Sequence, residues 1–174
     1  MSSHAPIFIS GFMGAGKTTV AQALARVLNR AAADLDQIIA AKEGLSPKEI
    51  IERHGEEAFR EVETRILREL LDEGAVDVIA LGGGAWTLRR NRELIRKHNG
   101  IAVWLDAPFE LCWRRIMEGG NKRPLALSER QARALFLKRT PLYELASVRI
   151  DAKEDKSAEE IALAIVTALD VMQA

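Results

Sequence analysis

Residues 11–18, GFMGAGKT, match the pattern G-x-x-x-x-G-K-[ST] and constrain the fold of this chain more than any other feature. A short apolar run, Ile7–Ile9, precedes them, and apolar residues at helical spacing follow over 18–29. Glycines allow backbone N–H groups to converge on phosphate oxygens, and the N-terminus of the following helix attracts the same anion. The strand, loop and helix therefore predict a P-loop that binds the phosphates of a nucleotide.

Two side chains at the end of this loop suit the chemistry of a nucleotide. Lys17 can reach the β and γ phosphates, and the hydroxyl of Thr18 can bind Mg²⁺. A glycine-rich turn formed by chance is the alternative, but it would not require the strand, the pair at 17–18 and the helix together. The residues expected at the nucleotide are Gly11, Met13, Gly14, Ala15, Gly16, Lys17, Thr18 and Thr19.

Length and composition limit the classes of protein to which this chain can belong. The chain has 174 residues, which suits one domain spanning 1–174. Lys plus Arg and Asp plus Glu each total 25, and this balance argues against a general nucleic-acid or membrane-surface binder. We find no signal peptide and no apolar run near the ~20 residues of a membrane span. With one cysteine, Cys112, expected to be buried, we predict a cytoplasmic monomer.

Short apolar runs alternate with amphipathic helical patterns along the whole chain. Strands separated by helices in this way imply βαβ units and a parallel sheet covered on both faces. Strands are expected at 7–9, 31–35, 76–81, 101–105 and 147–151, and helices at 18–29, 36–42, from 46–49 onward, 57–73, 88–98, 108–117, 128–140 and 157–172.

The predicted fold is α/β: a three-layer αβα sandwich of the P-loop NTPase type, with a central parallel five-stranded sheet. One polar segment, about 117–128, contains Gly119, Gly120 and a cluster of charges. Long loops in compact domains often have a function, so we expect this segment to be a mobile lid.

Two carboxylates, Asp34 and Asp36, close the expected second strand. Side chains at positions i and i+2 of a strand point the same way, so both carboxylates can face the carboxyl edge of the sheet, where ligands bind in open α/β folds. Two adjacent acids suit two tasks, holding Mg²⁺ and accepting a proton from an attacking hydroxyl. The alternative is a solvated turn in which Asp36 caps the next helix.

Further motifs follow in a fixed order, and together they are far more specific than any one of them. The set resembles the shikimate kinases, small members of the nucleoside-monophosphate-kinase-like P-loop group, from about Ile7 to about Ile150. This resemblance implies Mg²⁺-dependent phosphoryl transfer from ATP to the 3-hydroxyl of shikimate, giving shikimate 3-phosphate and ADP in aromatic amino-acid biosynthesis. The motifs are the P-loop, Asp34-x-Asp36, Phe59-Arg60-x-x-Glu63, Gly82-Gly83-Gly84, Arg123-Pro124-Leu125 and Arg139-x-Pro141-Leu142-Tyr143.

On the donor side, the resemblance implies that Lys17 and Thr18 serve ATP and Mg²⁺. It further implies that Asp34 supports Mg²⁺ through water and that Arg115 covers the adenine ring. Arg123, on the lid, would close over the transferring phosphate. Without the other motifs, Arg115 would read as an exposed helix arginine and Arg123 as one charge in a solvated loop.

On the acceptor side, the resemblance implies that Asp36 hydrogen-bonds the reacting hydroxyl and is the candidate base. Arg60 and Arg139 would hold the substrate carboxylate, Glu63 would orient Arg60, and backbone N–H groups of Gly82–Gly84 would line the pocket. The residue types agree with these roles, because the planar fork of arginine matches a carboxylate. Arg60 and Glu63 are also spaced to pair on one helix face.

Each acceptor residue also has a purely structural explanation. Arg60 and Glu63 could form a surface ion pair, which would contribute little stability. The glycines could form a plain turn between a strand and a helix. Pro141 is expected to end or kink its helix, which would leave Arg139 at an exposed C-terminal turn where helix-end electrostatics accounts for it.

Four departures from the family pattern bear on which acceptor fits, since pocket shape decides which polyol is bound. They are Ala31-Ala32-Ala33 in place of larger strand residues, Ile51 in place of a frequent aromatic, Trp86 in place of a smaller apolar residue, and Ala126 in place of a second lid leucine.

Two rival functions remain open from the sequence. A kinase for another small acid, of the gluconate type, should lack the paired arginines Arg60 and Arg139, and both are present. A non-catalytic domain that senses shikimate or nucleotide would usually carry a DNA-binding segment, and we expect none because the first strand begins by Ile7. A nucleoside-monophosphate kinase is disfavoured because acids, rather than a base-binding pattern, follow the second strand.

Overall fold

The structure is a computed structural model that describes residues 5–74, 76–119 and 128–173. Arg123, Ala126 and most of the segment expected to form the lid lie outside the described residues. Within the described part of the chain, no helix is long and apolar enough to cross a membrane.

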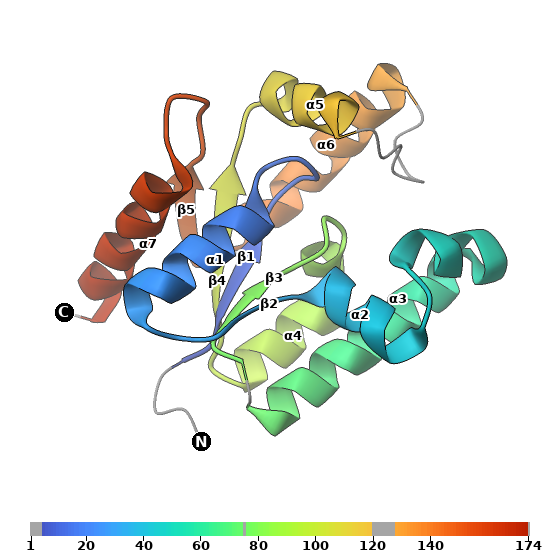
Figure 1. Ribbon diagram of the computed structural model, residues 1–174, viewed down its shortest axis with the longest axis horizontal. Coiled ribbons are helices and arrows are strands. Elements are labelled where there is room, and N and C mark those ends of the chain that lie inside the picture. Colours follow the sequence, from blue (N-terminus) through green and yellow to red (C-terminus); the bar gives the residue numbers. More distant parts are fainter. Residues whose placement is uncertain (1–4, 75, 120–127, 174) are drawn as a thin grey trace.

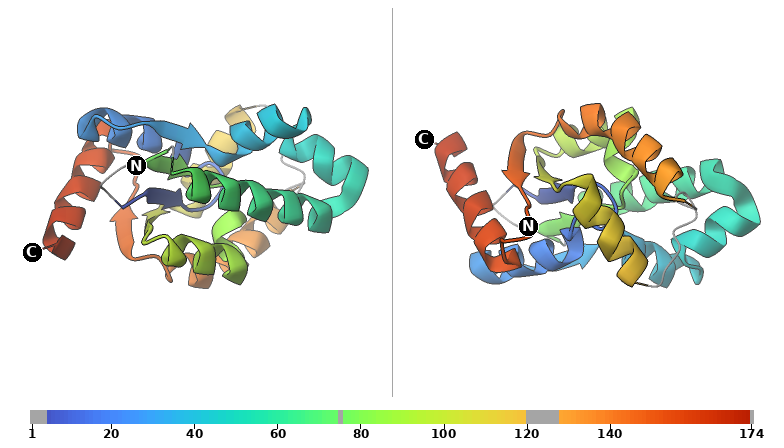
Figure 2. Two further views of the ribbon diagram at one scale, coloured as in Figure 1. Left: turned by 90° about the horizontal axis from the view of Figure 1, so that it is seen from below. Right: turned by 90° about the horizontal axis from the view of Figure 1, so that it is seen from above.

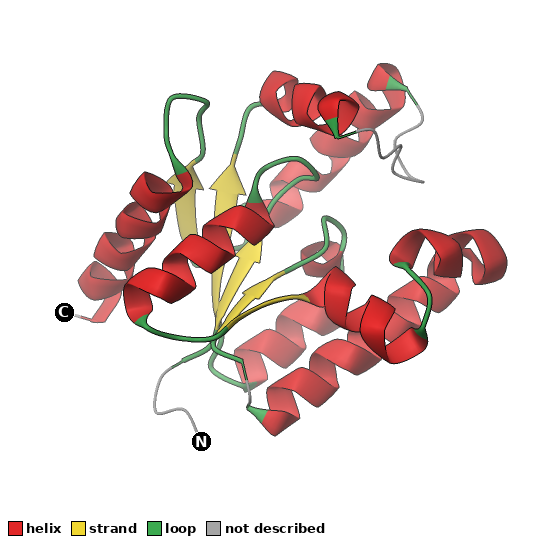
Figure 3. Ribbon diagram, in the orientation of Figure 1, coloured by secondary structure: helices red, strands yellow, loops and turns green. Residues whose placement is uncertain are grey.

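The described strands form one sheet with the order β2-β3-β1-β4-β5, and every neighbouring pair is parallel. The predicted α/β fold with a five-stranded parallel sheet is therefore confirmed. Figure 3 shows the strands directed toward the loops that bear the sequence motifs. The strands are β1 (Ile7–Ser10), β2 (Ala32–Asp34), β3 (Val78–Ala80), β4 (Ile101–Asp106) and β5 (Val148–Asp151).

Helices cover both faces of the sheet, as the alternation of patterns predicted. Figure 2 shows α1 on one face and α4 with α6 on the other, and α7 packs against α1 and β5. The α2–α3 pair projects to one side (Figure 1). The helices are α1 (Lys17–Leu28), α2 (Leu35–Glu43), α3 (Pro47–Glu73), the short 3₁₀ turn η1 (Ala85–Thr87), α4 (Arg89–Lys97), α5 (Phe109–Glu118), α6 (Glu129–Tyr143) and α7 (Ala158–Gln173).

The P-loop begins at the middle of the sheet because it follows the central, buried strand. All four residues of β1 are buried, as expected for a parallel strand covered on both faces, and β1 lies between β3 and β4. The loop after β1 therefore starts at the centre of the carboxyl edge, the usual ligand-binding edge of an open parallel sheet. Cys112 is fully buried in α5, as predicted.

The second strand is shorter than predicted. It covers Ala32–Asp34, and α2 begins at Leu35, so Asp36 lies in the first helical turn and not in a strand. Asp34 is the N-cap of α2: its Oδ1 accepts hydrogen bonds from the N–H groups of Asp36 (2.9 Å) and Gln37 (3.3 Å). The strand-spacing explanation for the two carboxylates is therefore wrong, and so is the alternative in which Asp36 is the cap.

The segment 46–73 forms two helical parts on either side of a kink, as predicted, and together they make up α3 (Pro47–Glu73). The capping box of Ser46 and Glu49 begins α3 as predicted, with Pro47 in its first turn. Gly55 has φ 88° and ψ 165°, which is not helical, and divides α3 into two parts. Residues of the first part of α3 line a pocket together with the glycines that follow β3.

The prediction that Pro141 would end its helix and expose Arg139 is wrong. Helix α6 continues through Pro141 to Tyr143, and Arg139 is only 6% exposed. Proline costs stability inside a helix, but tertiary contacts often override local preference. Here the residue that follows the proline turn, Tyr143, is buried and donates a hydrogen bond to the carbonyl of Gly83, which holds the last turn in place.

Candidate active site

The P-loop has a backbone shape that requires glycine. Gly11, Gly14 and Gly16 have φ of 142°, 80° and 92°, in the region that residues with a Cβ rarely adopt. A Cβ added at Gly14 would lie 2.5 Å from the carbonyl oxygen of Cys112, and one at Gly11 would lie 2.8 Å from that of Leu105. The loop therefore fits closely against α5 and the end of β4.

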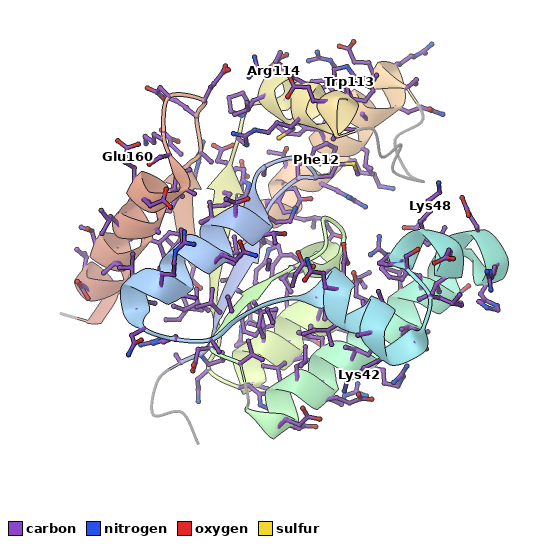
Figure 4. The ribbon with its side chains drawn as sticks, viewed as in Figure 1. Phe12, Lys42, Lys48, Trp113, Arg114 and Glu160 are labelled. Atoms are coloured by element: carbon purple, nitrogen blue, oxygen red, sulfur yellow. The ribbon has the colours of Figure 1, made fainter. Side chains whose placement is uncertain are left out.

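An aromatic cluster anchors this loop from outside. Phe12, labelled in Figure 4, is buried, and its ring meets Phe136 of α6 edge-on with centroids 5.1 Å apart. Phe109 of α5 lies 6.4 Å from Phe12 and 5.5 Å from Phe136, between ring centroids. The side chain of Phe12 thus anchors the P-loop in the core, while the backbone of the loop faces the ligand cleft.

The nucleotide cleft brings together most residues predicted for it. Lys17 lies at the start of α1, and its Nζ donates to the carbonyl of Phe12 at 2.9 Å. Arg115 of α5 reaches across, with Nη1 donating to the carbonyl of Gly14 at 3.2 Å. The cleft is lined by Gly14, Gly16, Lys17, Thr18, Thr19, Asp34, Asp36, Leu81, Gly82, Gly83 and Arg115.

Three other residues predicted for the nucleotide are placed differently. Gly11 and Ala15 are buried within the loop. Met13 is also buried, and it lines the neighbouring pocket instead of the nucleotide cleft.

Two oxygen-bearing side chains meet at the expected metal position. Thr18 Oγ1 donates to Asp34 Oδ2 at 2.5 Å, joining the start of α1 to the end of β2. A hydroxyl and a carboxylate suit Mg²⁺, which usually keeps several waters and is held by one or two protein oxygens plus phosphates. Among the described residues no cluster of three His, Cys, Asp or Glu side chains could hold a metal. This pair therefore fits a metal held jointly with a nucleotide.

A second pocket opens beside the nucleotide cleft and shares residues with it. Asp36, Gly82 and Gly83 line both cavities, so the two spaces meet at the first turn of α2 and the glycine loop, residues 82–84. The lining comprises Met13, Asp36, Pro47, Lys48, Ile51, Phe59, Arg60, Glu63, Gly82, Gly83, Gly84 and Arg139. The structure thus gathers every described residue predicted for the acceptor.

Arg60 and Glu63 form a buried ion pair and not a surface one. Arg60 Nη1 lies 3.1 Å and 3.0 Å from the two carboxylate oxygens of Glu63, and Nη2 lies 3.2 Å from Glu56 Oε1. The side chain of Arg60 is 11% exposed, and that of Glu63 is fully buried. Such a pair holds the arginine in one orientation, because breaking it would leave a buried charge without compensation.

The carboxyl group of Glu63 has an unusual proton affinity. Burial raises its pKa to about 7, against the lowering effect of Arg60, and the nearby charge of Asp36 raises it further. Gly82 separates the two acids: a Cβ there would lie 2.8 Å from Asp36 Oδ1 and 3.3 Å from Glu63 Oε1. The acceptor pocket therefore contains two acids of different character, one facing the nucleotide cleft and one fixing Arg60.

Arg139 approaches the same pocket from α6. A Cβ added at Gly83 would lie 3.4 Å from Arg139 Nη1, so the guanidinium faces the glycine loop. Burial lowers the pKa of Arg139, and the neighbouring Arg60 lowers it too, while the hydroxyl of Tyr143 opposes both. Two cations held close together in a buried pocket favour an anion between them.

Several residues of the site were not found from the sequence. Pro47 and Lys48 line the pocket from the first part of α3, beside Ile51, which the family pattern had already singled out, and Lys48 stands on the exposed outer side of α3 (Figure 4). Tyr143 was part of a recognised motif but carried no assigned role. The sequence feature that could have indicated the pocket residues of α3 was a glycine, Gly55, within a helical pattern. For Tyr143, the indication was the motif that contains it.

Comparison with known proteins decides the family. The shikimate kinase family model matches residues 13–170. The chain belongs to the shikimate kinase family. The shikimate kinase of Ruegeria pomeroyi is 37% identical over 168 residues, covering 95% of this chain and 85% of that protein. That of Geobacter sulfurreducens is 41% identical over 166 residues, covering 92% and 88%.

Solved structures agree with this assignment. The structure of shikimate kinase from Acinetobacter baumannii in complex with shikimate has a TM-score of 0.88 and 38% identity, over 98% of this chain and 95% of that one. Shikimate kinase from Aquifex aeolicus has a TM-score of 0.80 and 32% identity, over 97% and 98%. A gluconokinase from Sinorhizobium meliloti, at 18% identity and a TM-score of 0.56, shares the fold. The chain is thus an ATP-dependent kinase, as the order of motifs predicted.

Proposed function

We propose that this chain transfers the γ-phosphoryl group of ATP to the 3-hydroxyl of shikimate, with Mg²⁺, at the junction of its two cavities. The observation that carries this assignment is the sharing of Asp36 and the glycine loop by both cavities. A phosphoryl group held over the P-loop and a hydroxyl held in the acceptor pocket would meet there. Holding reactants in line is the main contribution of the protein to phosphoryl transfer.

The paired arginines would bind the acceptor carboxylate. Arg60 is fixed by Glu63, and Arg139 enters from the opposite side on α6. Each guanidinium presents parallel N–H donors that match a carboxylate, and the bound carboxylate would compensate the positive charge of both arginines. This clamp favours a small acid with hydroxyl groups over an uncharged sugar. Within such an acid, it would fix which hydroxyl points toward Asp36.

Asp36 would orient the reacting hydroxyl and accept its proton. Its position in the first turn of α2 places it at the boundary of both cavities. In kinases, the acid that accepts the hydroxyl proton mainly positions the nucleophile for in-line attack. Glu63 is less suited to this role, because both of its oxygens are engaged by Arg60.

On the donor side, backbone N–H groups of the P-loop and Lys17 would hold the β and γ phosphates. Thr18 and Asp34 would hold Mg²⁺, which when bound neutralises charge that develops on the transferring group. Arg115 lies next to Gly16, where a Cβ would be 3.5 Å from its Nη1, and would cover the nucleotide. For Arg123, closure over the phosphate remains a prediction from the resemblance.

A coupled assay that reports ADP release tests the assignment, with shikimate and gluconate as competing acceptors. We expect turnover with shikimate and none above the ATPase background with gluconate. Absence of shikimate-dependent turnover would overturn the proposed acceptor. Calorimetric binding of shikimate without product would instead support a sensing domain.

We further propose that the enzyme acts as a monomer in the cytoplasm, since both cavities are built from one chain and the composition suits a reducing compartment. Sedimentation equilibrium at assay concentrations tests the first point. Fractionation of the native host tests the second.

A further inference from the structure

One wall of the acceptor pocket is assembled from two elements that are distant in sequence. Gly83 belongs to the loop after β3, and Arg139 belongs to α6. The position of an acceptor between them depends on how these elements are held relative to each other. A misplacement of about 1 Å in such a wall can cost a large factor in rate.

Tyr143 contacts both parts of this wall. It lies one helical turn after Arg139 on α6, so the two side chains leave the same face of the helix. Its hydroxyl donates to the carbonyl oxygen of Gly83 at 2.5 Å. A hydroxyl has one hydrogen to donate and two lone pairs to accept with, so its oxygen can also face the guanidinium of Arg139. Hydrogen bonding to this hydroxyl opposes the lowering of the pKa of Arg139 by burial.

Burial and ring stacking hold the side chain of Tyr143 in one position. Its side chain is 1% exposed, and the ring stacks on Trp104 of β4 with centroids 6.3 Å apart and an interplanar angle of 25°. Burial raises the pKa of Tyr143 to about 12, against the lowering effect of Arg139. The hydroxyl therefore stays protonated and keeps its donor role at any pH at which a kinase is assayed.

The rest of the glycine loop is held by other contacts. The carbonyl of Gly84 accepts from Thr87 Oγ1 at 2.6 Å, and that of Ala85 accepts from Asn91 Nδ2 at 3.0 Å. Trp86 makes a second bond to α6, with Nε1 donating to the carbonyl of Leu142 at 3.0 Å. Trp86 does not line the acceptor pocket, whereas Gly83 does. Of the two hydrogen bonds that join this region to α6, the one from Tyr143 thus reaches a residue that lines the pocket.

We propose that Tyr143 is a positioning residue for the acceptor. Its hydroxyl fixes the loop at Gly83 relative to the guanidinium of Arg139, so that backbone and side-chain donors reach the same acceptor molecule. Tyr143 itself does not line the pocket and acts through these two residues. Its effect should therefore be on acceptor binding, and not on the nucleotide cleft.

The test is Tyr143→Phe, which removes one oxygen atom and keeps the ring. We expect KM for shikimate to rise roughly three- to tenfold, the effect of one hydrogen bond, with KM for ATP unchanged. The comparison variant is Trp86→Phe, which removes the other hydrogen bond between the loop and α6. It should leave KM for shikimate within about twofold, since its bond lies outside the pocket.

A double-mutant cycle with Arg139→Lys gives a second readout. If Tyr143 acts through Arg139, the two substitutions should be non-additive in shikimate binding measured by calorimetry. Additive effects, or an unchanged KM for shikimate in Tyr143→Phe, would overturn the role of Tyr143. So would an equal rise in both KM values, which would indicate general loosening.

The role of Tyr143 depends on the proposed acceptor, and the wild-type control separates the two. If wild-type enzyme fails to turn over shikimate, the proposed function fails. If wild-type enzyme is active and Tyr143→Phe matches it, the role of Tyr143 alone fails. Should Tyr143→Phe be too unstable at assay temperature, the shift in its melting temperature on adding shikimate, relative to that of wild type, measures acceptor binding directly. An equal shift would overturn the inference.

Discussion

The guanidinium of Arg60 lies directly against the backbone of Gly84, so closely that a Cβ at Gly84 would be 2.3 Å from Nη2 and 2.6 Å from Cζ. Gly84 is nevertheless not in a left-handed conformation, with φ −103°. Close approach, and not backbone freedom, therefore explains this glycine. The contact ties the third residue of the glycine loop to one arm of the proposed carboxylate clamp.

Gly84→Ala should displace Arg60 and weaken acceptor binding. Arg60 cannot move freely, because Glu63 and Glu56 hold its guanidinium. We expect KM for shikimate to rise by roughly tenfold or more, equivalent to one charge-assisted hydrogen bond, with KM for ATP unchanged. Steady-state kinetics with each substrate varied in turn gives both values.

Gly44→Ala is the matched control for this substitution. Gly44 has φ 67° and no atom within 4 Å of an added Cβ, so the change strains the backbone without touching the pocket. It should lower stability by about 1 kcal/mol and leave both KM values alone. If the two variants had the same kinetic effect, the contact between Gly84 and Arg60 would not be the cause.

Asp36→Asn should reduce turnover far more than it reduces ATP affinity. The substitution keeps the size of the side chain but removes its ability to accept a proton. We expect kcat to fall roughly 10²- to 10⁴-fold, the usual effect of losing a general base. Fluorescence titration with a nucleotide analogue should give a similar Kd for both proteins. Equal losses in kcat and nucleotide affinity would argue against a role at the acceptor.

The raised pKa of Glu63 predicts that the stability of the protein depends on pH. Burial raises the pKa of Glu63 to about 7 from the ordinary glutamate value of 4.5, so between these pH values the native state binds more protons than the unfolded state. Its contribution to stability is therefore fully present below about pH 4.5 and is lost as pH rises through about 7. In urea titrations, Glu63→Gln should lose less stability than wild type between these pH values. Parallel curves for the two proteins would contradict the raised pKa.

Local sequence patterns were sufficient to predict the part of the site that binds the nucleotide. The P-loop needs one strand, one loop and one helix in succession, and each carries its own pattern: β1 is buried throughout and α1 begins at Lys17. The positive φ values at Gly11, Gly14 and Gly16 are ones that glycine, unlike other residues, adopts without strain. The position of Asp36 was less predictable, because the alanines before it form a weak strand and Asp34 is a strong helix cap.

The acceptor half depends on tertiary contacts that no local pattern contains. Arg139 was expected at an exposed helix end because Pro141 follows it, yet packing of α6 against the glycine loop buries it. Lys48 lines the pocket from the part of α3 that precedes the break at Gly55. The family resemblance supplied Arg60 and Arg139 where periodicity could not.

Asp34→Asn separates the metal role of Asp34 from its structural role. Asp34 Oδ1 caps α2, and Oδ2 accepts the hydrogen bond from Thr18. Asparagine caps helices about as well as aspartate, so the fold should be retained with a change in melting temperature of only a few degrees. The lost negative charge should raise the Mg²⁺ concentration needed for half-maximal activity by roughly tenfold.

The readout is a titration of Mg²⁺ at saturating ATP and shikimate, repeated for wild type and Asp34→Asn. Activity of the variant should recover at high Mg²⁺, since Thr18 and the phosphates still supply ligands, and KM for shikimate should not change. Gln37→Ala is a suitable control, because it alters the same helical turn at an exposed position without removing a charge. If Asp34→Asn needed the same Mg²⁺ concentration as wild type, Asp34 would not belong to the metal site and would serve only as a helix cap.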